Sequence, residues 1–383
     1  MTRPDGSEVA TSVLHAHLGR RIPSDIAASP DGGAVVVTEN LDRTASVIKL
    51  AASAAIVWER SIDGSPPSSE RAKVAVGPSG NVYVATTTRY DISAMPPEGD
   101  DIEITAFTPA GDVRPGWPQR INVAFRDWVS DIAVDANDNV HVVGTTDDRE
   151  DFVYDGQRPY LASYREDGSV LRAAELVDAG SAPPETAIWS QSVALTPDGR
   201  LYVSIIALRF GSDGGGDTRL AAFDAEGEIV EGYPMTLSDS GASSPIAVAP
   251  NGKLFVLENQ RLYTIDANGA LLDDAPQHAA LPDAGQHWPS RNQNAFTASS
   301  TGDLYLVGTA RDQPGNPGPS PTSDVFVQSL TPTGASRAGF PVYLATPEWD
   351  DAAAIALDTD GAKAWVAWRM PNSQGCVTLI PAN

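Results

Sequence analysis

The 383-residue chain is predicted to be an all-β protein. Polar and apolar residues alternate in short runs, glycine and proline are abundant at 33 and 30 residues, and apolar residues nowhere recur at helical spacing over three turns. Alternation with a period of two is typical of half-buried strands, and turn-forming residues separate such strands. A hydrophobic content of 42% is enough to build a substantial core.

One hairpin motif repeats seven times along the chain. Each copy joins an alternating strand, a polar turn and a second alternating strand, and the copies begin at Asp25, Lys73, Asp131, Ser192, Pro245, Ala295 and Ala354. Glycine reaches the positive φ of such a turn without a steric clash, and six copies have it: Gly32, Gly80, Gly199, Gly252, Gly302 and Gly361. The third copy has Asp138 and Asn139 instead, which tolerate the same conformation next best.

A second hairpin follows most copies, so each repeat is predicted to be a four-stranded antiparallel sheet. These hairpins begin at Ile104, Tyr160, Leu220, Leu262 and Phe326, and the first repeat has a degenerate version from Ala45. The turns recur about every 55 residues, which suits the blade of a β-propeller with long loops. Because a closed set of repeats runs as one domain, residues 1–383 are predicted to form a single domain.

The two ends of the chain are predicted to complete one blade together. The segment from Cys376 matches a third strand and stops before a fourth, and residues 4–18 supply the missing turn and strand. Their pairing would close a seven-bladed β-propeller and leave few exposed strand edges.

The repeats, exemplified by DIAVDANDNVHVVGT from Asp131, resemble the bacterial seven-bladed β-propeller repeat families of the SBBP and NHL-like kind. The resemblance covers essentially the whole chain and implies the propeller fold. It implies no particular activity, because such propellers serve as lyases, hydrolases, lectins and scaffolds.

Composition excludes several classes of partner. The formal net charge of −24 would repel the phosphate backbone, so nucleic acid is not an expected partner. No apolar run reaches the roughly 18 residues of a membrane span, so no membrane association is expected. The single cysteine, Cys376, allows no internal disulfide and no cysteine-based zinc site. No cofactor is expected, and the protein is predicted to be a monomer.

The sequence leaves the cellular location open. The first residues include no apolar stretch of the kind that secretion signals contain. If Met1 is the native start, a cytoplasmic location is expected. If a longer precursor was trimmed, the protein is secreted.

Connection lengths predict where a binding site lies. The turns within each hairpin are short, whereas long connections join the second and third strands from Thr86, Thr145, Ile206 and Thr309. The longest connection between blades starts at His278. Long loops on a rigid scaffold usually carry binding residues, so the site is predicted on this long-loop face, around the central channel.

Four tryptophans are predicted to rim that face. Trp128, Trp189, Trp288 and Trp349 each lie a few residues before an innermost strand, in the connections between blades. Their rings would suit stacking on sugars or on a hydrophobic ligand. Alternatively, each tryptophan packs adjacent blades together, since contacts between blades need large apolar residues.

Arginines form a second recurring group. One arginine follows the second strand of every repeat, at a position that varies by several residues: Arg43, Arg89, Arg149, Arg209, Arg261, Arg311 and Arg369. Arg291 lies in the long connection after His278. Basic residues on an acidic body would attract an anionic ligand. The alternative is that they pair with loop acids such as Asp147 and Asp217.

No catalytic motif is present, and His287 is the best single candidate for acid-base chemistry or metal binding. It shares the long connection with His278 and Trp288. Asp135, Asn137 and Asn139 resemble part of a calcium loop but lack its distal glutamate, so turn chemistry explains them and no metal site is predicted.

A Gly-aromatic-Pro step recurs in the region of the outermost strand. It occurs at Gly116-Trp117-Pro118, Gly232-Tyr233-Pro234 and Gly339-Phe340-Pro341. Proline is tolerated on an edge strand, so the step is interpreted as structural, with an exposed protein-contact stripe as the alternative.

The leading functional hypothesis is a non-catalytic binding module. Its ligand would be a small molecule, a glycan or a protein on the long-loop face, with an anionic or carbohydrate ligand favoured. The alternative is an enzyme, a lyase or a hydrolase, with its active site at the same place, and a purely structural scaffold is the third possibility.

Overall fold

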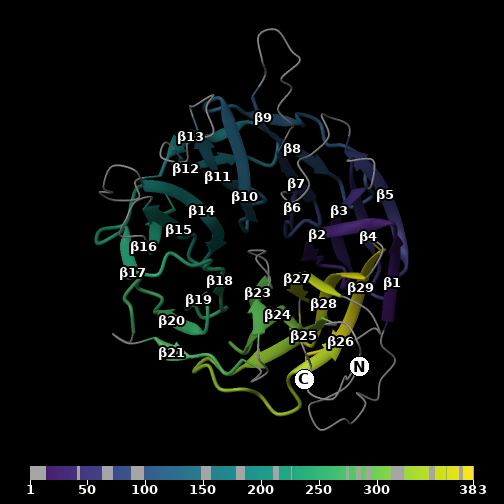
Figure 1. Ribbon diagram of the computed structural model, residues 1–383. Coiled ribbons are helices and arrows are strands. Elements are labelled where there is room, and N and C mark those ends of the chain that lie inside the picture. The colour runs from purple at the N-terminus through teal and green to yellow at the C-terminus, as the bar shows by residue number, and fades with distance from the viewer. Residues whose placement is uncertain are drawn as a thin grey trace. The chain divides into compact units, whose positions relative to one another are not determined.

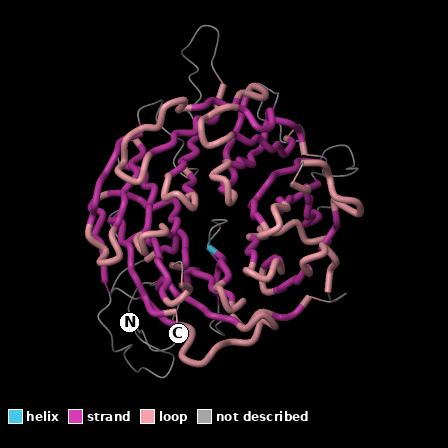
Figure 2. The backbone as a smooth tube through the Cα atoms, turned by 180° about the vertical axis from the view of Figure 1, so that it is seen from behind, coloured by secondary structure: helices cyan, strands magenta, loops and turns pink. Residues whose placement is uncertain are grey.

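The computed structural model describes residues 14–40, 44–62, 72–87, 99–147, 157–177, 186–209, 215–225, 227–272, 276–281, 286–289, 295–311, 323–344, 350–358, 360–370 and 374–382. Figure 2 shows that this part of the chain is strand and loop, apart from a single 3₁₀ residue at Ala295. In the described ranges, no helix has the length and hydropathy needed to cross a membrane.

The strands form seven four-stranded antiparallel blades, so the protein is an all-β, seven-bladed β-propeller, as the sequence predicts (Figure 1). The chain divides into two compact units. The single-domain organisation of residues 1–383 stays a prediction.

One unit, centred on residues 60–246, contains blades 2, 3 and 4. Blade 2 consists of β6 (Lys73–Val76), β7 (Val82–Thr87), β8 (Ile102–Phe107) and β9 (Gln119–Ile121). Blade 3 consists of β10 (Arg126–Val134), β11 (Val140–Asp147), β12 (Arg158–Tyr164) and β13 (Val170–Leu176). Blade 4 consists of β14 (Thr186–Leu195), β15 (Leu201–Arg209), β16 (Gly215–Phe223) and β17 (Met235–Ser238).

The other unit contains blades 1, 5, 6 and 7. Blade 1 consists of β2 (Arg21–Ala28), β3 (Ala34–Asn40), β4 (Ala45–Leu50) and β5 (Ile56–Ile62), and blade 5 of β18 (Ile246–Val248), β19 (Leu254–Glu258), β20 (Arg261–Ile265) and β21 (Gln277–His278). In blade 6, β22 (Gln286–Pro289) and β23 (Phe296–Ala298) both pair with β24 (Leu304–Arg311), followed by β25 (Ser323–Leu330) and β26 (Val342–Leu344). Blade 7 consists of β27 (Asp351–Leu357), β28 (Lys363–Met370), β29 (Gln374–Pro381) and β1 (Leu14–Gly19).

Blade 7 is completed by both ends of the chain, which confirms the predicted closure. The N-terminal strand β1 pairs antiparallel with β29, with Leu14 opposite Leu379 and His17 opposite Cys376. Ala16 and Leu18 point into the core of this blade, whereas His15 and His17 are exposed. The alternation of buried and exposed residues is that of an edge strand packed on one side.

The hairpin turns adopt the predicted geometry. All six turn glycines have positive φ, and Asp138 of the third copy has φ of 60°. The Asp135 carboxylate holds that third turn, because it accepts hydrogen bonds of 2.8 Å from the backbone N–H groups of Asn137 and Asn139. Its second oxygen accepts a bond of 2.8 Å from the Asn139 side chain. Ordinary turn chemistry therefore occupies the oxygens that resembled a calcium loop.

A β-bulge in the innermost strand connects successive blades. In blades 3, 4 and 7 the register shifts immediately after Val129, Ser190 and Ala352. The backbone N–H of each of these residues donates a hydrogen bond to a threonine hydroxyl of the preceding blade. The bonds are Val129 to Thr87 at 3.1 Å, Ser190 to Thr145 at 3.2 Å and Ala352 to Thr309 at 3.0 Å. The three threonines occupy the same position in their second strands. We call this contact the threonine clamp.

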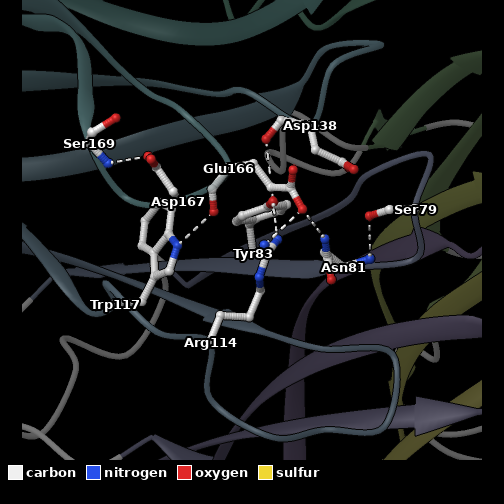
Figure 3. Close-up of polar contacts among 9 residues, drawn as sticks. All are labelled: Ser79, Asn81, Tyr83, Arg114, Trp117, Asp138, Glu166, Asp167 and Ser169. Atoms are coloured by element: carbon white, nitrogen blue, oxygen red, sulfur yellow. Dashed lines mark hydrogen bonds and ion pairs between the residues drawn. The ribbon is translucent and has the colours of Figure 1, made fainter.

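The Gly-aromatic-Pro steps are structural, as expected. Each aromatic-proline bond is cis and directly precedes the fourth strand of its blade. In blade 2, Trp117 packs edge-on against Tyr83 with ring centroids 5.7 Å apart, and Trp117 donates its indole N–H to the Glu166 backbone oxygen of blade 3 at 3.1 Å (Figure 3). The step thus fastens the outer part of one blade to the next.

An arginine beside this step completes the contact. Arg114 donates to the Tyr83 hydroxyl at 3.1 Å and forms an ion pair with Glu166 at 2.7 Å (Figure 3). Tyr83 donates in turn to the Asp138 backbone oxygen at 3.3 Å. Burial raises the pKa of Tyr83 to about 12, partly offset by Arg114, so its hydroxyl remains a donor across the physiological range.

The same arrangement recurs in blade 6 and is reduced in blade 4. Arg337 donates to the Tyr305 hydroxyl at 2.8 Å, and Tyr305 donates to the Ala382 backbone oxygen. In blade 4 the corresponding aromatic pair is Tyr202 and Tyr233, with ring centroids 5.9 Å apart, but Val230 stands where the other blades have arginine.

Removal of the bonded tyrosine hydroxyls should weaken the fold in a position-dependent way. Tyr83→Phe and Tyr305→Phe are each expected to lower the free energy of unfolding by about 1–2 kcal/mol, because each loses a bond to arginine and a bond to a backbone oxygen. Tyr202→Phe, the matched control without an arginine, should cost less than either. Urea denaturation of the three variants checks this ranking, and an equal loss in all three would contradict it.

Candidate functional site

The innermost strands of blades 3 and 4 carry a tryptophan at the same register position. Trp128 lies opposite Thr145 in β10–β11, and Trp189 lies opposite Ile206 in β14–β15, each just before the bulge. The prediction that these tryptophans lie in connections between blades is therefore wrong. The strands extend through them because the threonine clamp satisfies backbone N–H groups at the bulge.

Each of these two tryptophans is anchored to the preceding blade through its indole N–H. Trp128 donates to the Asp100 carboxylate at 3.3 Å, and Trp189 donates to the side-chain oxygen of Gln157. The backbones join at the same places, because Asp127 donates to Asp100 at 2.7 Å and Ile188 donates to Gln157 at 3.2 Å. Both rings are half-buried. The indole N–H groups thus serve the scaffold, and part of each side chain is exposed.

Trp288 and the two candidate histidines are in blades 5 and 6. Trp288 lies on β22 opposite Thr309, which is the register position of Trp128 and Trp189 in their own blades. His287 lies opposite Ala310 on the same strand, and His278 is exposed on β21. Both histidines were predicted in a loop, and the structure places them on short strands instead. Trp349 lies outside the described residues.

The arginines at the long-loop face include one well-defined cluster in blade 4. Arg209 pairs with one oxygen of Asp217 at 2.9 Å, and Arg219 pairs with the other at 2.8 Å. Two guanidinium groups share one carboxylate, so the cluster carries a formal charge of about +1. This pairing with a loop acid is the alternative that the sequence left open for Arg209.

The other predicted arginines are less fully defined. Arg369 is half-buried on β28, opposite Asp351 in the register. Arg311 is the last residue of β24. Arg89, Arg149 and Arg291, together with Arg43, lie outside the described residues, so their role in ligand binding stays a prediction.

Sequence reasoning missed a group of buried polar residues beside Trp128. Asp101 of blade 2 and Asp127, Thr146 and Tyr160 of blade 3 are all buried. Asp101 forms an ion pair with Arg120, and Asp127 accepts a hydrogen bond of 2.7 Å from the Val123 backbone. The only sequence signal was the run Asp100-Asp101 followed, in the next blade, by Asp127-Trp128.

The surroundings of Asp127 favour its neutral form. Burial raises the pKa of Asp127 above its ordinary value, the Asp101 carboxylate adds to the rise, and the neighbouring Thr146 hydroxyl and the backbone N–H groups oppose it. Burial raises the pKa of Tyr160 well above its ordinary value, with further contributions from Asp127 and Asp101. Burial also raises the pKa of Glu103 on β8, and the charge of Arg120 opposes this rise.

One serine, histidine and aspartate contact exists, but its geometry does not fit nucleophilic catalysis. His141 Nδ1 lies 2.9 Å from the Ser163 hydroxyl, while its Nε2 lies 3.8 Å from Asp135, beyond hydrogen-bond reach. Ser163 is only 3% exposed, so a substrate cannot reach it. Across the described ranges, no cluster of three or more histidine, cysteine, aspartate or glutamate side chains is arranged to hold a metal ion.

The fold and this rim define the chain as a β-propeller with anchored tryptophans on two adjacent blades. No family model and no curated protein matches the sequence. Among solved structures, the chain is similar to puromycin hydrolase, determined as a serine-to-alanine mutant complexed with PGG, with 17% identity and a TM-score of 0.56. The match covers 91% of this chain and 50% of the hydrolase, so the chain spans half the length of that neighbour. At this identity the likeness shows the fold alone.

The Asp135 network should make stability depend on pH. Burial raises the pKa of Asp135, but the nearby His141 side chain and the hydrogen bonds from Asn139 and Asn137 outweigh it and hold the pKa well below the ordinary value of 3.8. A lowered pKa in the folded state stabilises the fold above the ordinary pKa, and this contribution is lost as pH falls through the folded value. Asp135→Asn should therefore be about 1–3 kcal/mol less stable than wild type at pH 7.

Urea denaturation at pH 7 and pH 3 checks this expectation. The difference between wild type and Asp135→Asn should narrow at pH 3, which lies below the ordinary pKa of 3.8. Asp239→Asn, at an exposed position outside the network, is the control and should match wild type at both pH values. An equal difference at both pH values would show that the Asp135 charge contributes nothing.

Proposed function

We propose that the protein is a non-catalytic binding module that recognises a carbohydrate through the long-loop rim of blades 3 and 4. The observation that carries this proposal is the equivalent placement of Trp128 and Trp189. Both rings are half-buried, and both are fixed in orientation by an indole hydrogen bond to the preceding blade. Rigid aromatic surfaces bind with little loss of conformational entropy, and their amphipathic faces match the C–H faces of sugars.

The polar groups around the rings support a carbohydrate more strongly than a simple anion. Asp100 places a partly exposed carboxylate next to the Trp128 ring, where sugar hydroxyls can donate to it. The side chains of Arg120, Arg209 and Arg219 each form an ion pair with an aspartate, which offsets their attraction for an anion. The positive cluster of Arg209 and Arg219 with Asp217 favours an acidic sugar as the second candidate ligand.

An enzyme remains the alternative function. The structural neighbour is a hydrolase, which is compatible with that alternative, although the likeness concerns the fold. In the contact of Ser163, His141 and Asp135, the serine is buried and the histidine lies beyond hydrogen-bond reach of the aspartate, so this contact offers no support for hydrolysis. The binding module is therefore the function that the geometry favours.

Tryptophan substitutions test the proposed carbohydrate site. Calorimetric titration with neutral gluco-, xylo- and manno-oligosaccharides and with hexuronate oligosaccharides would identify the preferred ligand of the wild type. Trp128→Ala and Trp189→Ala should each weaken binding of that sugar about tenfold, equivalent to about 1.4 kcal/mol. Trp128→Phe, which keeps a ring for stacking, should lose less than Trp128→Ala.

Controls separate binding from folding and from charge. Leu171→Ala changes an exposed apolar residue on the outermost strand of blade 3, and its affinity should equal that of wild type. Arg209→Gln should weaken binding of hexuronate oligosaccharides and leave neutral ones unchanged if the blade 4 cluster recognises acidic sugars. If no oligosaccharide of either kind binds, or if both tryptophan variants bind as wild type does, the proposal is wrong.

A further inference from the structure

Two histidines are neighbours on the strand that completes blade 7. His15 and His17 are alternate residues of β1, the outermost strand of that blade, and both are exposed (Figure 1). Alternate residues of a strand share one face, at a spacing of about 6.5–7 Å along the strand. Ala16 and Leu18 occupy the other face and are buried in the core shared with blade 1. The two imidazoles therefore lie next to each other on an exposed surface.

A buried hydroxyl fixes the orientation of the His15 ring. His15 Nδ1 lies 3.0 Å from the hydroxyl oxygen of Thr378, the residue directly opposite on β29. Thr378 is buried, and its hydroxyl oxygen also accepts a hydrogen bond of 2.9 Å from the indole N–H of Trp368. A hydroxyl oxygen has two lone pairs, so Thr378 can accept from Trp368 and from His15 at the same time. The sheet thus holds His15 through Nδ1, and Nε2 is the ring nitrogen that remains.

This contact suits the tautomer of His15 that binds metal ions. When Nδ1 carries the proton and donates it to Thr378, Nε2 keeps its lone pair. Histidines that bind a metal through one ring nitrogen almost always donate a hydrogen bond from the other, which fixes the ring and raises the basicity of the ligating nitrogen. Thr378 supplies the acceptor for this bond, so it is a positioning residue for His15.

We propose that His15 Nε2 and the imidazole of His17 chelate one divalent cation of the copper, nickel and zinc class. Imidazole is a ligand that suits these ions, whereas magnesium and calcium prefer oxygen. Metal–nitrogen bonds are about 2.0–2.1 Å long for zinc, so two rings on alternate residues can reach one ion between them, with water as the other ligands. No group of three histidine, cysteine or acidic side chains in the described ranges is placed to hold a metal, so the site is a two-residue chelate. The inference departs from the sequence-based expectation of no metal.

The bound ion would stabilise the strand pairing that joins the two ends of the chain. Pairing of β1 with β29 holds His15 and His17 in extended backbone and places Thr378 beside His15. An ion that binds this arrangement more tightly than the unfolded chain stabilises it by mass action. The net charge of −24 raises the local concentration of cations. The site lies on blade 7, and the proposed carbohydrate site lies on blades 3 and 4, so neither proposal depends on the other.

Metal titration of the untagged, chelator-treated protein tests the site at neutral pH without any sugar. Calorimetry should show one equivalent of copper(II), nickel or zinc binding, with copper(II) the tightest of the three. Saturating zinc should raise the melting temperature by about 2 °C or more. Magnesium and calcium at the same concentration should not raise it, because imidazole is a poor ligand for these ions.

Substitutions of the ligands and of the positioning residue make the test specific. Thr378→Val keeps both imidazoles but removes the acceptor for His15, so it should weaken binding about tenfold, and Thr378→Ser should bind as wild type does. His15→Gln and His17→Gln each remove a ligand and should weaken binding more than Thr378→Val. The matched control is His278→Gln, since His278 is also exposed on an outermost strand but has no second histidine two residues away, so it should keep full affinity.

Electron paramagnetic resonance of the copper(II) complex identifies the ligands without relying on stability. The spectrum of wild type should show two coordinated nitrogens, and the spectra of His15→Gln and His17→Gln should show one. Two results would overturn the proposal. In the first, copper(II), nickel and zinc all fail to bind at millimolar concentration. In the second, the two glutamine variants bind as wild type does or the copper spectrum shows no coordinated nitrogen, which assigns the ion to surface carboxylates.

Discussion

The threonine clamp is the constraint on which the rim depends. A bulge interrupts the innermost strand and leaves one backbone N–H without its usual partner in the ladder. The hydroxyls of Thr87, Thr145 and Thr309 supply that partner from the preceding blade. Blade 1 has neither half of this contact. Pro23 precedes its bulge and has no N–H to donate, and the preceding blade has Arg369 where the other blades have the threonine.

This constraint explains why the candidate site is built on strands. The clamp extends the strand through Trp128 and Trp189, and the indole bonds to Asp100 and Gln157 fix the rings. Residues that serve the contact between blades therefore also present the exposed surface. The two readings of the tryptophans, blade packing and ligand stacking, are compatible because different parts of each side chain perform them.

The repeat made most of the fold predictable from the sequence. Turn residues can be recognised from a few neighbouring residues, so the six glycines and Asp138 identified the hairpins. The unmatched strands at the two ends of the chain indicated the pairing of β1 with β29. The Gly-aromatic-Pro steps were correctly interpreted as structural for the same reason. Features that recur from repeat to repeat and involve only neighbouring residues can be recognised in the sequence.

The site was harder to predict because its contacts join different blades. The bulge after Val129 has no residue signature, so Trp128 was placed in a connection rather than on β10. Asp127 and Tyr160 are 33 residues apart in the chain, and only the pairing of β10, β11 and β12 shows that they share one face of the sheet. Arginines such as Arg209 looked equivalent along the chain, but their pairing with acids depends on the sheet.

Fluorine NMR of the protein labelled with 5-fluorotryptophan tests the central claim most directly. The resonances of Trp128 and Trp189 are assigned by replacing each residue with phenylalanine, and the oligosaccharide that binds most tightly is then titrated in. The account predicts that these two resonances shift with the sugar while those of the buried Trp58 and Trp365 stay unchanged. Shifts confined to other tryptophans, with Trp128 and Trp189 unmoved at saturation, would contradict it.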